Sequence, residues 1–426
     1  MKKSVDSILQ EVLEKINPPK TDLDIIKNSL KEFLAKFGKN LKSLKINAEI
    51  FIGGSFAKDT LIKKDYYDID IFVRFDKKYE NNKISDLTAK VLKGIKNFSK
   101  IHGSRDYFRI NIGPSFFIEL IPVIRIKNQK QAINITDLSY FHVKYIKRKL
   151  KSKKILDEVR FGKAFCYANN CYGAESYING FSGYSLELLI LYYSSFLKFI
   201  KAMSKVEDKL IIDIEKHYKN KSQIMMDVNS SKLKSPIILI DPTYKQRNAL
   251  AALSEETFKK FQRDCKKFLQ NPDIKEFELK KIDLEKIKNN AKKRRYEFIL
   301  IMAETNKQLG DVAGSKLLKF HKHFGYEIGK VFEIKNKGFD YSGKKVAEYF
   351  FVVKKRKQII FSGPMVKDKK NLMTFKKKHR HTFVKSKRIY AKEQVKFNIK
   401  EFVKNWKNKN TQKLKEMSIT ELKVIN

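Results

Sequence analysis

IGGSFAKDTLIKKDYYDIDIFVRF, residues 52–75, joins a Gly-Ser turn to two carboxylates that stand two positions apart. Side chains of an extended strand alternate between its two faces, so Asp68 and Asp70 project to one side while Ile69 and Ile71 project into a core. Two like charges held this close require a cation. Mg²⁺ is the best candidate, because its hard oxygen chemistry favours a few carboxylates together with substrate phosphates.

The turn before the acid pair and a later strand add to this pattern. Gly53 and Gly54 let the backbone approach a phosphate closely, and the hydroxyl of Ser55 can donate to it. A third carboxylate, Glu119, occurs in the strand-like run FFIELIPVIRI, and a third strand beside the first two would complete a two-metal site. A D-x-D pair alone is more often a solvated strand face. The turn and three acids together predict a nucleoside triphosphate site.

The charge of the chain favours a polyanionic partner, nucleic acid before membrane. Its 426 residues include 92 Lys and Arg but 47 Asp and Glu, a net charge of +45. With 42% hydrophobic and 12% aromatic residues the chain is globular, which excludes a disordered basic tail. Residues 354–388 hold 14 Lys and Arg and one acid, a net +13, interleaved with Phe361, Phe375 and Phe383. Charge interleaved with aromatic rings suits a nucleic-acid surface.

Cysteine usage and the apolar segments predict a cytoplasmic protein without a membrane span. Cys166, Cys171 and Cys265 have spacings that fit neither a zinc knuckle nor a disulfide framework. The first residues form an amphipathic, charged pattern without the apolar core of a signal peptide. The most apolar long run, LELLILYYSSFLKF, is too short to cross a membrane and contains Glu187.

The periodicity of the chain predicts an α+β multidomain protein. Residues 1–44 read as two helices broken at Pro18 and Pro19. The runs AEIFI, DIDIFVRF and FFIELIPVIRI bracket a helix and form a mixed sheet. Residues 141–269 read as mostly helical, with Arg247 and Asn248 at a helix start. The runs FILIMAET, GSKLLKFHKHF, YEIGKVFEIK and AEYFFVVKKRKQIIF predict a C-terminal β-α-β-β sandwich domain.

The pattern G-S, a gap, D-h-D-h and a later h-[DE]-h, where h is hydrophobic, is similar to the polymerase-β-like nucleotidyltransferases. The chain most resembles the archaeal class I CCA-adding enzymes, which build or repair the 3′-terminal CCA of tRNA. The resemblance covers most of the chain in collinear blocks, which are VLEKINPPKTDLDIIKNSLKEFLAKF, TDLSYFH, YGAESYINGFSGYSLELLI, DPTYKQRNALAAL and GPMVKDKKNLMTFKKKH.

The resemblance implies template-independent transfer of nucleotides from CTP and ATP to tRNA, with release of pyrophosphate by a Mg²⁺-dependent two-metal mechanism. It makes Asp68, Asp70 and Glu119 the catalytic and metal-binding residues, although the family often has Asp where Glu119 stands. It also implies a nucleotide-binding set, which is Gly54, Ser55, Lys58, Ser139, His142, Lys163, Tyr172 and Arg247. Lys163 and Tyr172 are expected on helices as a clamp on the triphosphate, and Arg247 is expected to read the base. For Lys58 an exposed lysine is an equally good reading.

These expectations divide the chain into a nucleotidyltransferase head with N-terminal helices at 1–140, a helical nucleotide- and tRNA-binding domain at 141–270, an α/β body at 271–365 and a basic tRNA-binding tail at 366–426. The tRNA acceptor stem and elbow are the expected partners, and a homodimer is compatible with the sequence. The residues expected to grip tRNA phosphates are Lys376, Lys377, Lys378, Arg380, Lys385, Lys387 and Arg388.

Two other functions fit parts of the pattern. A poly(A) polymerase-like or oligoadenylate-type transferase would share the three acids but differ in acceptor and nucleotide. The context of Arg247 and the block at 363–379 argue for the tRNA enzyme instead. A catalytically silent RNA-binding protein would have no need to retain the acids together with Ser55, Lys163 and Tyr172.

Overall fold

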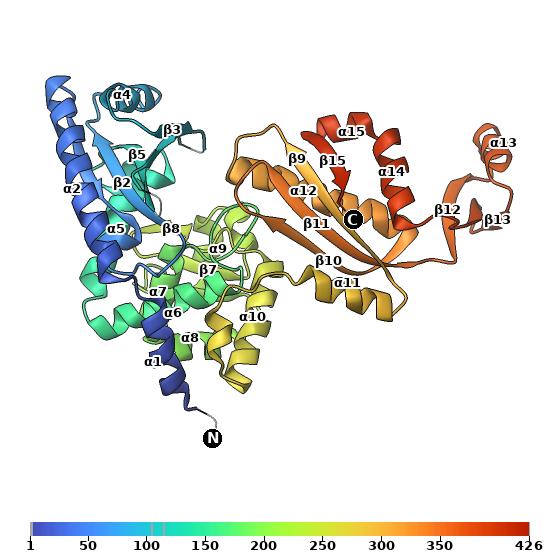
Figure 1. The fold of residues 1–426 in the computed structure, drawn as a ribbon, viewed down its shortest axis with the longest axis horizontal. Coiled ribbons are helices and arrows are strands. Elements are labelled where there is room, and N and C mark those ends of the chain that lie inside the picture. Colours follow the sequence, from blue (N-terminus) through green and yellow to red (C-terminus); the bar gives the residue numbers. More distant parts are fainter. Residues whose placement is uncertain (1–2, 104, 114–115, 426) are drawn as a thin grey trace. The chain divides into compact units, whose positions relative to one another are not determined.

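The computed structural model describes residues 3–103, 105–113 and 116–425, and the chain divides into two compact units, Met1–Lys280 and Lys281–Asn426 (Figure 1). No helix in the described residues is long and apolar enough to cross a membrane. The division after Lys280 does not decide the predicted boundary after residue 140, which stays a prediction. The predicted boundary at residue 366 is considered below. The two units are described separately.

Unit 1 begins with two helices and a mixed sheet. Ser4 caps α1 (Val5–Ile16), and the Pro18–Pro19 pair separates it from α2 (Lys20–Ser43), as predicted. The sheet has the order β1-β2-β5-β4-β3, with β2 and β5 parallel and the other pairs antiparallel. Its strands are β1 (Ala48–Ile52), β2 (Tyr67–Phe75), β3 (Phe98–Ile101), β4 (Tyr107–Asn111) and β5 (Phe116–Ile124).

Strand alternation gives this sheet one buried face. Ile69 and Ile71 of β2 and Ile118 of β5 are fully buried, and they share a core with Phe33 and Phe37 of α2. The short helix α3 (Gly54–Ala57) follows β1, and α4 (Ile84–Val91) also covers this core through Ile84 and Val91. The carboxylates of β2 therefore lie on the opposite face, as the sequence predicts.

The remainder of unit 1 is mainly helical, with serine caps at several helix starts. Its helices are α5 (Ser139–Lys149), α6 (Lys153–Ala168), α7 (Gly183–Tyr193), α8 (Phe196–Met203), α9 (Lys221–Asp227) and α10 (Glu255–Gln270). The side chains of Ser152, Ser182 and Ser254 accept hydrogen bonds from backbone N–H groups in the first turns of α6, α7 and α10. Phenylalanine rings from α6, α8 and α10 fill the core, to which α1 also contributes.

The prediction of a mostly helical 141–269 is wrong in one part, because a small sheet interrupts the helices. β6 (Leu210–Asp213) and β7 (Ile237–Asp241) are parallel, and β8 (Tyr244–Asn248) pairs antiparallel with β7. Arg247 therefore lies on a strand and not at a helix start. The Asp241 side chain accepts the Thr243 N–H at 2.8 Å, which closes the turn between β7 and β8.

Unit 2 contains an antiparallel sheet with the order β10-β11-β9-β15. Its strands are β9 (Glu297–Thr305), β10 (Phe332–Tyr341), β11 (Val346–Lys355) and β15 (Ile419–Val424). α11 (Leu284–Lys293) packs on one face against Phe350 and Val352. α12 (Asp311–Val331) and α14 (Ile399–Lys409) pack on the other, where Phe320, Phe324 and Trp406 meet; α15 (Thr411–Glu416) follows α14.

The order of β9, α12, β10 and β11 confirms the predicted β-α-β-β, with two differences. Residues 326–331, predicted as strand, continue α12, and the run 347–361 turns to form β11 and then β12 (Gln358–Met365). β12 belongs to a second sheet with the order β12-β14-β13, which also carries α13 (Lys369–Lys378); its other strands are β13 (Thr382–Lys385) and β14 (Arg388–Gln394). This basic lobe, residues 358–394, projects from one end of unit 2 (Figure 1).

The predicted tail at 366–426 is not separate from the body. β15 pairs with β9 along the edge of the main sheet, and Val403, Trp406 and Leu422 are buried in its core. The charge of the segment suggested a tail, but the apolar faces of α14 and β15 require a partner, which the body supplies.

Candidate active site

The three predicted carboxylates lie on adjacent parallel strands. In the register of β2 with β5, Asp70 is opposite Glu119 and Asp68 is opposite Phe117. Because side chains two positions apart share a face, Asp68, Asp70 and Glu119 project to the side of the sheet away from Ile69 and Ile71.

Burial and neighbouring negative charge disfavour the ionised forms of Asp70 and Glu119. Burial, followed by the charges of Asp68 and Glu119, raises the pKa of Asp70 to about 8. Burial likewise raises the pKa of Glu119, against the opposing effect of Arg109. Lys64 Nζ approaches Asp68 Oδ1 at 3.8 Å. A bound cation would remove this repulsion.

The third carboxylate, Glu119, forms an ion pair with Arg109, which was not predicted from the sequence. Arg109 lies opposite Glu119 on β4, its Nη2 donates to Glu119 Oε1 at 2.8 Å, and its guanidinium stacks over the Phe117 ring. The described residues contain no cluster of three or more His, Cys, Asp and Glu side chains arranged to hold a metal. The oxygen donors and mutual repulsion of Asp68 and Asp70 fit a divalent ion, whereas Glu119 would first have to leave Arg109.

The Gly-Ser turn folds directly onto Asp70. Gly53 N–H donates to the Asp70 backbone oxygen at 2.8 Å. Gly54 has φ +61°, and a Cβ at this position would lie 1.8 Å from Asp70 Oδ2. A side chain at position 54 would therefore displace the carboxylate. Ser55 lies next to this contact at the start of α3.

A second cluster joins the sheet half of unit 1 to its helical half. Glu187 on α7 accepts from Lys58 Nζ at 2.6 Å through Oε2 and from Lys163 Nζ at 2.8 Å through Oε1. Thr60 Oγ1 donates to Glu187 Oε1 at 3.1 Å and accepts from Lys163 Nζ at 2.7 Å. All four side chains are buried, so the exposed reading of Lys58 is wrong. The signal for Glu187 was a charge inside an apolar helix.

Tyr172 lies beside this cluster but not on a helix. It follows α6 and makes an isolated bridge with Phe181. A Cβ at Gly183 would lie 2.9 Å from Tyr172 Oη and 3.8 Å from Lys163 Nζ, so this glycine leaves room for the phenol and the amine together. Burial raises the pKa of Tyr172, which therefore stays a neutral donor.

His142 and Arg247 meet at the buried Asp241. Asp241 Oδ2 accepts from Arg247 Nη1 at 2.7 Å and lies 2.9 Å from His142 Nε2, and Oδ1 accepts from Tyr184 Oη at 2.9 Å. The His142 and Tyr184 rings stack with centroids 4.1 Å apart. Ser139 begins the same helix, α5, as His142.

Burial and charge shift the pKa values of Asp241 and His142. Burial disfavours the charged Asp241, but the hydrogen bond from His142 and the positive charge of Arg247 outweigh it and lower the Asp241 pKa. Burial lowers the pKa of His142 despite its contact with Asp241. Arg247 Nε is buried and has no hydrogen-bond partner among the described residues. Asp241 and Tyr184 were not predicted, because the contacts of Asp241 with His142 and Tyr184 join segments that are distant in sequence.

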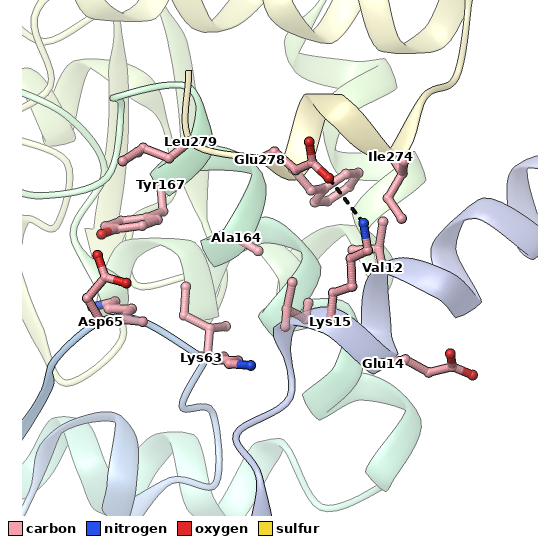
Figure 2. Close-up of a pocket in the computed structure, with 14 residues that line it drawn as sticks. Val12, Glu14, Lys15, Lys63, Asp65, Ala164, Tyr167, Ile274, Glu278 and Leu279 are labelled. Atoms are coloured by element: carbon pink, nitrogen blue, oxygen red, sulfur yellow. Dashed lines mark hydrogen bonds and ion pairs between the residues drawn. The ribbon is translucent and has the colours of Figure 1, made fainter. Parts of the chain in front are cut away.

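A cavity of about 630 Å³ lies near Asp68, but none of the three predicted catalytic carboxylates lines it. Figure 2 shows Lys15 and Glu278 paired at one side, with Nζ and Oε1 3.1 Å apart, and Asp65 and Tyr167 near each other at the opposite side. Lys64 connects this cavity to Asp68.

The predicted tRNA-binding residues lie in the basic lobe of unit 2. Arg388 is half-buried and its Nη1 donates to the Gly363 oxygen at 2.7 Å, so part of its role is structural. Phe375 contacts His379, and Phe383 stacks on Tyr390. The exposed members of the set are Lys376, Lys377, Lys378, Arg380, Lys385 and Lys387.

Comparison with known proteins identifies relatives across this chain. Two family descriptions match, "Nucleotidyltransferase domain" at residues 30–161 and "tRNA nucleotidyltransferase, second domain" at residues 157–278. The CCA-adding enzyme of Methanocaldococcus jannaschii is 29% identical over 91% of this chain and 87% of its own length. That of Saccharolobus shibatae is 31% identical over 67% of this chain and 64% of its own length.

The CCA-adding enzyme of Nanoarchaeum equitans is 40% identical over 49% of this chain, and the matched part spans about half (52%) of that relative's length. A solved cytoplasmic RNA terminal U-transferase covers 65% of this chain and 99% of its own, with a TM-score of 0.50 and 12% identity, which shows a shared fold alone. Nucleotidyltransferases of this superfamily generally use divalent metal ions. With both nucleotidyltransferase descriptions matched and curated relatives that agree on one name, the chain belongs to the archaeal CCA-adding enzymes, a family of tRNA nucleotidyltransferases.

Proposed function

We propose that this protein adds and repairs the 3′-terminal CCA of tRNA, without a nucleic-acid template, from CTP and ATP. The observation that carries the chemistry is the parallel pairing of β2 with β5, which sets Asp70 opposite Glu119 beside the Gly53–Gly54 turn. The match to a CCA-adding enzyme over 91% of the chain supports tRNA as the acceptor.

In this reaction the tRNA 3′-hydroxyl oxygen forms a bond to the α-phosphorus, and the bond from that phosphorus to the β-phosphate bridging oxygen breaks. Asp68 and Asp70, with Glu119, would hold Mg²⁺, which when bound stabilises negative charge on the phosphate oxygens. Burial raises the pKa of Glu119, which favours its role as a base. Once Glu119 has separated from Arg109, its carboxylate accepts the proton of the tRNA 3′-hydroxyl. Pyrophosphate is the leaving group.

Two groups of residues bind the incoming nucleotide. The amines of Lys58 and Lys163 and the phenol of Tyr172 bind the triphosphate, because cationic and neutral donors suit that anion. Arg247, held by Asp241 and with Nε unpaired among the described residues, reads the base. Ser139 and His142, which both lie on α5, contact the sugar and the phosphates of this nucleotide.

The tRNA is held mainly by exposed lysines and arginines of the basic lobe, since phosphate contacts supply most of the affinity for a folded RNA. Mg²⁺ as the metal, a cytoplasmic location and a homodimer complete the proposal. Light scattering of the purified protein would test the last point.

The decisive assay supplies purified protein with tRNA that ends at the discriminator base and each labelled nucleoside triphosphate in turn. We expect addition of C, C and A in that order, followed by arrest. Unlimited addition of A, or equal activity on an RNA without an acceptor stem and elbow, would overturn the tRNA assignment and favour a poly(A) polymerase-like enzyme.

A further inference from the structure

Glu187 is a buried carboxylate to which the proposed reaction gives no role. It lies within the apolar helix α7, and its two oxygens bind the amines of Lys58 and Lys163 at 2.6 and 2.8 Å. Thr60 completes the cluster with a hydrogen bond to the oxygen that Lys163 also contacts. One carboxylate thus orients both amines that the proposed function places on the triphosphate.

We propose that Glu187 is a positioning residue, which holds Lys58 and Lys163 where their amines bind the triphosphate of the incoming nucleotide. This inference rests on the proposed function for the identity of the nucleotide. Glu187 itself does not contact the substrate.

Burial makes a purely packing role for Glu187 a poor explanation. An ionised carboxylate inside a protein is costly unless paired, and a leucine would fill the same helix position without that cost. Despite burial, the charges of Lys163 and Lys58 hold the pKa of Glu187 below its ordinary value, so it remains an anion. Two amines and one carboxylate leave one net positive charge, which suits a polyanion.

The chain connectivity explains why a shared anchor is useful. Lys58 follows α3 beside the catalytic turn, 129 residues before Glu187, whereas Lys163 lies on α6, 24 residues before it. Lysine has a long stem with several rotatable bonds and loses much freedom when it binds a ligand. A fixed anchor restricts both stems before the nucleotide arrives and brings the sheet half and the helical half of unit 1 to one point.

Positioning and simple electrostatics predict opposite signs. If Glu187 only added a negative charge near the triphosphate, its neutralisation would tighten nucleotide binding. If Glu187 positions the amines, its neutralisation releases them and weakens binding, with a larger effect on KM than on kcat.

The test measures CTP binding by calorimetry, and KM and kcat for tRNA extension, in the full chain carrying Glu187→Gln or Glu187→Asp. The aspartate keeps the charge but is one methylene too short to reach both amines. Glu276→Gln is the matched control, because Glu276 is also a buried carboxylate bound to two lysines, Lys267 and Lys280, but it contacts none of the nucleotide residues.

We expect the CTP dissociation constant to rise at least tenfold in Glu187→Gln and several-fold in Glu187→Asp, with tRNA affinity unchanged and no change in the Glu276→Gln control. A folded Glu187 variant that binds CTP as tightly as the parent, or more tightly, overturns the proposal. If neither variant folds, the double-mutant cycle of Lys58→Met and Lys163→Met decides, since a shared anchor requires non-additive losses of CTP affinity and additive losses refute it.

The parent protein separates this inference from the proposed function. If the parent binds CTP but does not extend tRNA, the proposed function fails, and the comparison of CTP affinities still tests Glu187. If the parent adds CCA and the Glu187 variants bind CTP normally, only the positioning role fails.

Discussion

Unit 1 contains two clusters of buried charge, which differ in whether their charges are neutralised by ion pairs. One is the acid cluster on β2 and β5, and the other is the lysine cluster of Lys58, Lys163 and Glu187. In the lysine cluster each charged group has a partner within 2.8 Å. In the acid cluster Asp70 has no ion pair within the described part of the chain, and burial, followed by the charges of Asp68 and Glu119, raises its pKa to about 8. The lysine cluster is therefore organised without substrate, whereas the acid cluster is completed only by a cation. The predictions below test this contrast.

The largest effect is expected from Asp70→Asn, which removes the charge that most needs a cation. Nucleotide incorporation should fall by more than about a hundredfold, measured with tRNA lacking CCA, while tRNA binding stays nearly unchanged because the basic lobe supplies affinity. Asp76→Asn is a control that alters a partly exposed acid directly after β2, paired with Arg125. Appreciable turnover by Asp70→Asn in Mg²⁺ would refute the metal assignment.

Gly54→Ala should cost more than about tenfold in incorporation, because a Cβ would lie 1.8 Å from the Asp70 carboxylate in a backbone conformation that L residues rarely adopt. Gly94→Ala is the matched control, since Gly94 also has a positive φ, of +82°, but has open space around its Cβ position. Melting temperatures of both variants separate backbone strain from damage to the acid cluster. Equal activity of the two variants would contradict the role given to Gly54.

Because of the lysine cluster, we expect CTP binding to weaken as the pH rises. Burial lowers the pKa of Lys163 to about 8, although Glu187 opposes the shift. Lys163 is therefore charged below that pH and loses its charge above it, so the CTP dissociation constant should rise by up to about tenfold between pH 7 and pH 9. Lys163→Met should bind CTP more weakly and with little change over the same range. An equally steep rise in Lys163→Met would assign the titration to another group.

The smallest effect concerns the exposed charges of the basic lobe. Replacing Lys376, Lys377 and Lys378 by Ala should weaken tRNA binding a few-fold and reduce its salt dependence by roughly one unit of slope for each phosphate that these lysines neutralise. CTP affinity should not change. Replacing Lys400, Lys404 and Lys409, which are exposed on α14, removes the same charge elsewhere in unit 2. Equal slopes in the parent and the α13 variant would show that these lysines are only solvated surface.

The positions of the three acids were predictable because they depend on local rules. Strand alternation fixes the face of Asp68 and Asp70, and a later apolar run with a single acid, Glu119, supplies the neighbouring strand. The fold class could be predicted from hydrophobic periodicity, because apolar residues repeat about every two positions in strands and about every 3.6 positions in helices.

The residues that hold the functional groups were not predictable, because their roles depend on contacts between distant segments. Glu187 reads as an isolated acid in sequence, and only the packing of α7 against α6 brings Lys163 to it. Asp241 lies close to Arg247 along the chain, but its contact with His142 depends on the packing of β7 beside α5. The small sheet of β6, β7 and β8 was missed because short apolar runs such as IILID do not distinguish a buried strand from a helix.

The edge position of β15 also has a consequence for biosynthesis. Thr305, at the end of β9, donates a hydrogen bond to Ser418, 113 residues later, and β15 then pairs along β9. During translation β9 emerges long before its outer neighbour, so its edge stays unpaired until residues 419–424 have left the ribosome. A ribosome that stalls or terminates before this point would release a chain with an open apolar strand, which favours aggregation and recognition by chaperones.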